Sequence, residues 1–60
     1  MIPMRAEDIR PGDECEEGVA DIVSEDCEPG WVYIHYMPSL WRRLCLHETV
    51  NVLVPTELKS

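Results

Sequence analysis

Proline and glycine divide this chain into short segments, and this division constrains the fold more than any other feature. The breakers are Pro11-Gly12, Gly18, Pro29-Gly30, Pro38 and Pro55. Each of them favours a turn or ends a regular element. The chain has 60 residues, and short segments about ten residues apart between turn signals are typical of a small antiparallel sheet or barrel.

The segments between the breakers have the composition of strands. Residues 31–37 carry aromatic and β-branched side chains with a turn signal at each end, so they predict the strongest strand. Residues 19–24, 41–46 and 50–54 predict three more strands, and residues 13–17 predict a weaker one. We therefore expect an all-β fold of about five short antiparallel strands. It forms a single domain over residues 1–60, with its core in residues 5–54.

A helix is the alternative for residues 39–47. Ser39 would cap two helical turns, in which Leu40, Leu44 and His47 lie at helical spacing. An isolated helix of this length is marginal in water, and the strand at residues 31–37 needs a partner for its backbone groups. We favour the strand, and the sequence alone leaves the helix open.

A hairpin register follows if residues 38–40 form the loop between the predicted strands at residues 31–37 and 41–46. One face of the hairpin is then aliphatic, with the pairs Val32–Leu46, Ile34–Leu44 and Tyr36–Arg42. Because a slip by one residue would reverse every side chain, we expect this face to form the core. Other segments extend the aliphatic face with Ile9, Val19, Ile22, Val50, Val52 and Val54.

The opposite face of the hairpin carries both tryptophans of the chain. Its predicted pairs are Trp31–His47, Tyr33–Cys45, His35–Arg43 and Met37–Trp41. Tryptophan, tyrosine and arginine are enriched at interaction hot spots, and exposed aromatic grooves bind extended peptides. We interpret this face as a surface that binds a protein partner, with the candidate site residues Trp31, Tyr33, His35, Trp41, Arg43 and His47. The alternative is that the tryptophans only cover the open end of a barrel or are buried against residues 1–10.

The charge of the chain is strongly acidic and unevenly distributed. Twelve acidic residues oppose five basic ones, the net charge is −7, and ten of the acids lie in residues 1–30. Binding to a phosphate backbone needs clustered lysine and arginine, so we expect no direct binding to nucleic acid. The acidic half permits two interpretations. It mimics nucleic acid and inhibits a nucleic-acid-binding host protein, or it is a solvated face that keeps the domain in solution.

No catalytic, phosphate-binding or cofactor motif is present, so we expect a non-catalytic protein without a cofactor. Cys15, Cys27 and Cys45 form no CxxC pair, and we expect three reduced thiols and no bound metal. The alternative is a metal or thiol site at Cys45, His47 and His35. The chain has neither a signal-peptide pattern at its start nor an apolar run long enough to span a membrane, so we expect a cytoplasmic protein.

The order of these segments resembles a known group of proteins. Residues 5–13 are similar to the A-x-D-L-x-x-G-D opening of small, uncharacterised SH3-like β-barrel proteins of actinobacteria and actinobacteriophages. Residues 18–19, 30–34 and 49–52 fit the layout that follows, with residues 47–49 as the short turn before the last strand. The acidic residues 14–17 depart from the more apolar pattern of the group. The resemblance implies an SH3-like barrel and an accessory protein of a phage or mobile element in a bacterial host, and it carries no catalytic residue.

Overall fold

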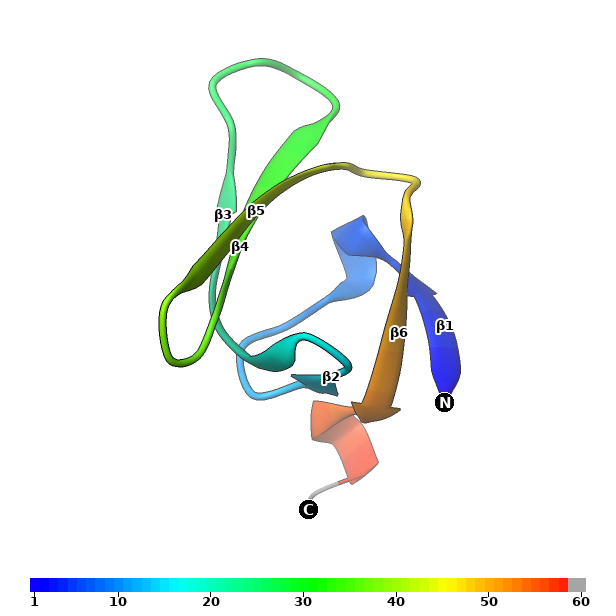
Figure 1. Cartoon of the computed structure of the whole chain (residues 1–60). Helices are drawn as coiled ribbons and strands as arrows, with labels where there is room; N and C mark the ends of the chain where they lie inside the picture. Colours follow the sequence, from blue (N-terminus) through cyan, green and yellow to red (C-terminus); the bar gives the residue numbers. More distant parts are fainter. Residues whose placement is uncertain (59–60) are drawn as a thin grey trace.

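Antiparallel strands make up most of this computed structural model, which describes residues 1–58 (Figure 1). The elements are β1 (Ile2–Arg5), the 3₁₀ turn η1 (Ala6–Asp8), β2 (Glu14–Cys15), β3 (Gly18–Glu25), β4 (Trp31–Tyr36), β5 (Leu40–Cys45), β6 (Thr49–Val54) and the 3₁₀ turn η2 (Thr56–Leu58). The strands form one sheet in the order β1-β6-β2-β3-β4-β5. The predicted all-β, antiparallel class is confirmed. Among the described residues, however, the sheet is not closed into a barrel.

The strands agree with the sequence prediction except at the start of the chain. β1 pairs with β6 and is not among the five predicted strands, because Pro3 is a poor signal for a strand. β5 shows that the helical alternative for residues 39–47 is wrong. Within residues 1–58, no helix has the length and apolar character needed to cross a membrane.

The core lies between two parts of the folded sheet. In Figure 1, β3, β4 and β5 form one side and β1 and β6 the other, with β2 at the bottom. The buried side chains are Ala6, Ile9, Cys15, Ala20, Val32, Ile34, Tyr36, Val50 and Val52, and the carboxylate of Asp13 is buried with them. Five of the predicted core residues on β4 and β6 are therefore buried: Val32, Ile34, Tyr36, Val50 and Val52. Leu44, Leu46, Val19 and Val54 are only half-buried. For Leu44 the reason is that β5 is an edge strand, and no strand of residues 1–58 covers its outer side.

The predicted register of the β4–β5 hairpin is wrong by two residues. The loop consists of residues 37–39, and Tyr36 pairs with Leu40, Ile34 with Arg42 and Val32 with Leu44. This register places Leu40, rather than Arg42, opposite the fully buried Tyr36. Because the error is an even number of residues, every side chain within β4 and β5 stays on its predicted face.

A β-bulge in β3 overturns the prediction for Ile22. Ala20 pairs with Tyr36, but Ile22 pairs with His35, so Asp21 is the extra residue in the ladder. An extra residue reverses the alternation of the side chains that follow it. Ile22 is therefore 45% exposed on the outer side of the sheet, and Val23 packs against the core in its place.

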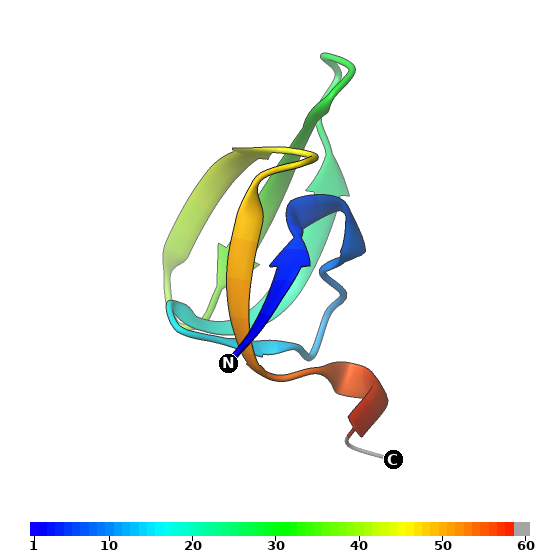
Figure 2. The same cartoon turned by 90° about the vertical axis from the view of Figure 1, so that its right-hand side faces the viewer.

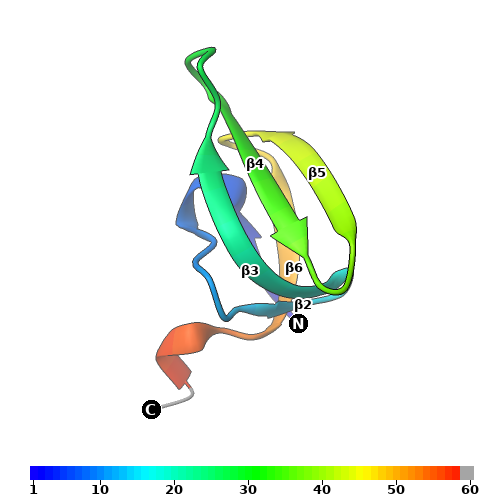
Figure 3. The same ribbon diagram turned by 90° about the vertical axis from the view of Figure 1, so that its left-hand side faces the viewer.

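The two edge strands of the sheet are β1 and β5, and the chain segments that follow them meet at one corner. The Ala6 N–H donates to the Glu48 carbonyl at 2.8 Å, and the Glu7 N–H donates to the Leu46 carbonyl at 3.1 Å. These bonds hold η1 against the segment that joins β5 to β6 (Figure 2). Beyond this corner β5 runs along the border of the sheet, with β4 on its inner side and no strand of residues 1–58 on its outer side (Figure 3).

Candidate functional site

Five of the six predicted site residues lie together on the outer face of β4 and β5. Trp31, Tyr33 and His35 alternate along β4 with buried residues, and Trp41 and Arg43 lie opposite His35 and Tyr33 on β5. The bulge in β3 adds Ile22 beside His35. We call these six residues the aromatic face: Ile22, Trp31, Tyr33, His35, Trp41 and Arg43.

The large side chains of the aromatic face are accessible to solvent. Trp41 is 55% exposed and Tyr33 37%, and Trp31 is half-buried. Neither tryptophan is therefore a core residue. Sequence reasoning missed Ile22 because it assumed unbroken alternation in β3, and no residue in the sequence marks the position of the bulge.

His47 does not belong to the aromatic face. It follows the end of β5, and Trp31 pairs with Cys45 rather than with His47. The imidazole Nδ1 of His47 lies 3.9 Å from a carboxylate oxygen of Glu7, on η1. The two-residue error in the register produced this misplacement.

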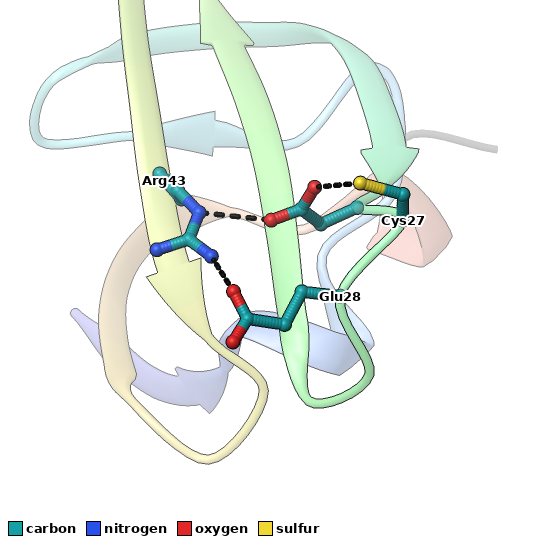
Figure 4. Close-up of polar contacts among 4 residues, drawn as sticks. Cys27, Glu28 and Arg43 are labelled. Carbon is teal, nitrogen blue, oxygen red and sulfur yellow. Dashed lines mark hydrogen bonds and ion pairs between the residues drawn. The ribbon is translucent and has the colours of Figure 1, made fainter.

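Arg43 links the aromatic face to the loop between β3 and β4. Its Nε–H donates to Asp26 at 2.9 Å and its Nη2 donates to Glu28 at 2.8 Å, so the side chain reaches from β5 across β4 to the β3–β4 loop (Figure 4). Its Cζ lies 4.1 Å from the centroid of the Trp31 ring, within the range of a cation–π contact. The bond from Arg43 lowers the pKa of Asp26 and raises the pKa of the guanidinium itself. The Cys27 thiol also donates to Asp26, at 3.4 Å.

His35 fixes the other end of the aromatic face. Its ring centroid lies 4.7 Å from that of Trp41, with the two planes tilted by 52°. Its Nδ1 lies 2.5 Å from a carboxylate oxygen of Asp21, the extra residue of the bulge. Because the contact with Asp21 holds the His35 ring in place, the exposed indole of Trp41 packs against a side chain of fixed orientation.

The structure does not assemble the alternative metal or thiol site. Cys45 lies opposite Trp31, His35 lies at the other end of the hairpin, and His47 lies beyond the strand. Within residues 1–58 no group of three or more His, Cys, Asp or Glu side chains could hold a metal ion. All three cysteines are free thiols.

A shallow hollow lies at the tip of the β3–β4 hairpin. Its volume is about 190 Å³, and it is lined by Glu25, Asp26, Glu28, Pro29, Gly30, Trp31 and Leu46. Sites for small molecules usually have volumes of roughly 300–1,000 Å³. The hollow is therefore small for a substrate site, and the aromatic face remains the candidate functional site.

No protein-family model, curated protein or solved structure matches this chain.

Proposed function

We propose that this chain is a non-catalytic module that binds a protein partner through the aromatic face. The observation that carries the proposal is the exposed Trp41, beside Tyr33 and Ile22, on a single face of the sheet. Large aromatic side chains contribute much contact area with few rotatable bonds. They supply many of the hot spots at protein interfaces.

The ion pairs that hold Arg43 and His35 in place favour the same function. Arg43 is fixed by Asp26 and Glu28, and His35 is fixed by Asp21. Side chains that are already ordered lose little conformational entropy when a partner binds.

The finer assignments belong to the same proposal. The resemblance of residues 5–54 to SH3-like small barrels of actinobacteria and their phages supports a barrel-like module. It also supports a role as an accessory protein of a phage or mobile element. The corner where η1 meets the β5–β6 segment is compatible with such a fold, because it brings the two ends of the sheet together.

The test compares two equally exposed apolar residues on different parts of the sheet. Trp41 is 55% exposed on the aromatic face, and Leu53 is 52% exposed on β6. Affinity capture from a lysate of the encoding cells, quantified by mass spectrometry, should identify a partner whose recovery depends on Trp41. Trp41→Ala should weaken that interaction at least about tenfold, as expected for a hot-spot residue.

Leu53→Ala is the matched control and should leave the capture unchanged. Far-UV circular dichroism should show that both variants are folded. If Leu53→Ala weakens capture and Trp41→Ala does not, the aromatic face is not the binding surface.

A further inference from the structure

The free edge of β5 directs backbone groups of the aromatic face away from the sheet. The Leu46 N–H donates to the Gly30 carbonyl at 3.0 Å, and these residues continue the β4–β5 register. In an antiparallel ladder, every second residue exchanges hydrogen bonds with a given neighbour. Residues 40, 42 and 44 therefore direct their backbone groups toward β4, whereas Trp41 and Arg43 direct theirs toward the free edge.

The pairing between β3 and β4 independently shows which backbone groups of β4 point toward β5. The Asp26 N–H donates to the Trp31 carbonyl at 3.2 Å. The odd-numbered residues of β4 therefore direct their backbone N–H and C=O groups toward β3. The even-numbered residues of β4 then direct their backbone groups toward β5, in agreement with the bond at Gly30.

The edge at β1 is less suited to pairing. The bond from Ala6 to Glu48 continues the β1–β6 register. Ile2 and Met4 therefore direct their backbone groups toward β6, whereas the backbone of Pro3 is directed toward the free edge. Proline has no N–H to donate, and proline on an edge blocks the addition of another strand. β5 contains no proline and is six residues long, against four for β1.

The inner side of β5 defines what an added strand would contact. Leu40 and Leu44 are half-buried against the core, and the exposed Arg42 lies between them on the same face. Arg42 donates its Nε–H to Glu17 at 3.1 Å, which leaves the other donors of its planar guanidinium to be shared. β5 carries two arginines and no acid, within a chain of net charge −7.

We propose that the partner adds an extended segment to the free edge of β5 as a further strand. This inference rests on the proposed protein-binding function and names the form of the partner. The segment carries the pattern apolar-x-acidic-x-apolar. Its apolar residues cover Leu40 and Leu44, its carboxylate meets Arg42, and its intervening residues lie beside Trp41 and Arg43 on the aromatic face. Backbone pairing supplies affinity and the alternating side chains supply specificity, as in other cases of strand addition.

A second copy of this chain fits the edge poorly. Antiparallel self-pairing along most of β5 would have its twofold axis at Arg42 or at Arg43. Either register brings two copies of the same arginine directly opposite each other, which is unfavourable for like charges. The arginines therefore oppose self-pairing and favour an acidic segment.

The experiment uses the whole chain and a short blocked peptide of this pattern, with isoleucine, glutamate and isoleucine at alternate positions between threonines. Hydrogen exchange followed by NMR reports on individual amides. At a peptide concentration about ten times the dissociation constant, exchange at the Trp41 and Arg43 amides should slow about tenfold. The amides on the free edge of β1 should be unaffected.

Two peptide controls separate strand addition from other binding. N-methylation of the peptide amides that face β5 should abolish the protection, whereas N-methylation of the alternate amides should preserve it. Exchanging glutamate for glutamine should lower the affinity about two- to fivefold for the natural chain, as expected for an exposed ion pair. The same exchange should have no effect on Arg42→Gln, and its effect should be retained in Arg10→Gln, where the altered arginine lies outside the sheet.

The outcomes distinguish this inference from the proposed function. If the peptide leaves exchange at Trp41 and Arg43 unchanged while Trp41→Ala still releases the captured partner, strand addition is wrong and the protein-binding function stands. If partner capture is also independent of Trp41, both proposals fail.

Discussion

Tyr36 is fully buried, and its hydroxyl has no hydrogen-bond partner among residues 1–58. Burial raises the pKa of this hydroxyl well above its usual value, and the nearby Cys15 and Glu17 raise it further. A buried polar group without a partner loses its bonds to water and gains none in return. The aromatic ring therefore stabilises the core while the hydroxyl opposes it.

Tyr36→Phe removes only the hydroxyl, so the variant should be as stable as the natural protein or more stable by about 1 kcal/mol. Urea unfolding followed by circular dichroism measures this difference. Tyr33→Phe, on the exposed side of the same strand, is the control and should change nothing. A clear loss of stability in Tyr36→Phe would show that the hydroxyl has a partner in the folded protein.

At the scale of an element, β5 combines an open edge with two adjacent arginines. Arg42 and Arg43 lie on opposite faces of the strand and pair with Glu17 and with Asp26 and Glu28. Charged side chains on an edge are a common protection against pairing between molecules. The half-buried Leu40 and Leu44 make this protection necessary, because they would be covered by a second strand.

Arg42→Val should therefore promote self-association through β5. The change removes a like-charge contact and extends the apolar stripe between Leu40 and Leu44, so sedimentation velocity should detect concentration-dependent dimers or larger species. Arg10→Val has the same chemical change outside the sheet, and it should remain monomeric under the same conditions. Equal association of both variants would rule out the edge as the cause.

At the scale of the whole molecule, the buried thiol of Cys15 makes part of the stability depend on pH above 9. Burial raises the pKa of the Cys15 thiol from 9.0 to about 11, and the charges of Asp13 and Glu17 add to this effect. The unfolded chain ionises at the lower value, so it loses protons first as the pH rises. The contribution of the neutral thiol is complete below pH 9 and is lost between pH 9 and about 11.

The stability advantage of the natural protein over Cys15→Ala should therefore shrink at alkaline pH. The expected slope is at most about 1.4 kcal/mol for each pH unit above 9, measured by urea unfolding at several pH values. Because Cys15 also raises the pKa of Tyr36, both proteins carry Tyr36→Phe in this comparison, which removes that hydroxyl. A difference that is constant from pH 7 to pH 11 would contradict the raised pKa of Cys15.

Much of the fold could be predicted because it depends on local patterns. The breakers and the β-branched runs located five of the six strands, and the alternation in β4 predicted that Val32 and Ile34 face the core while Trp31, Tyr33 and His35 face outward. This alternation has a period of two. An error of two residues in the hairpin register therefore left the aromatic face intact.

The remaining features depend on contacts between distant segments, which no local pattern contains. The bulge that exposes Ile22 arises where β3 leaves its pairing with β2 and follows β4, and the position of His47 depends on where the hairpin loop closes. The acids that bind Arg42 and Arg43 lie 25, 17 and 15 residues away in sequence. The sequence by itself determined which side chains of β4 and β5 share a face, because alternation is a property of a single unbroken strand. Only the tertiary structure decided which strand lies at the edge and which acids hold the arginines, because these depend on how the sheet folds over its core.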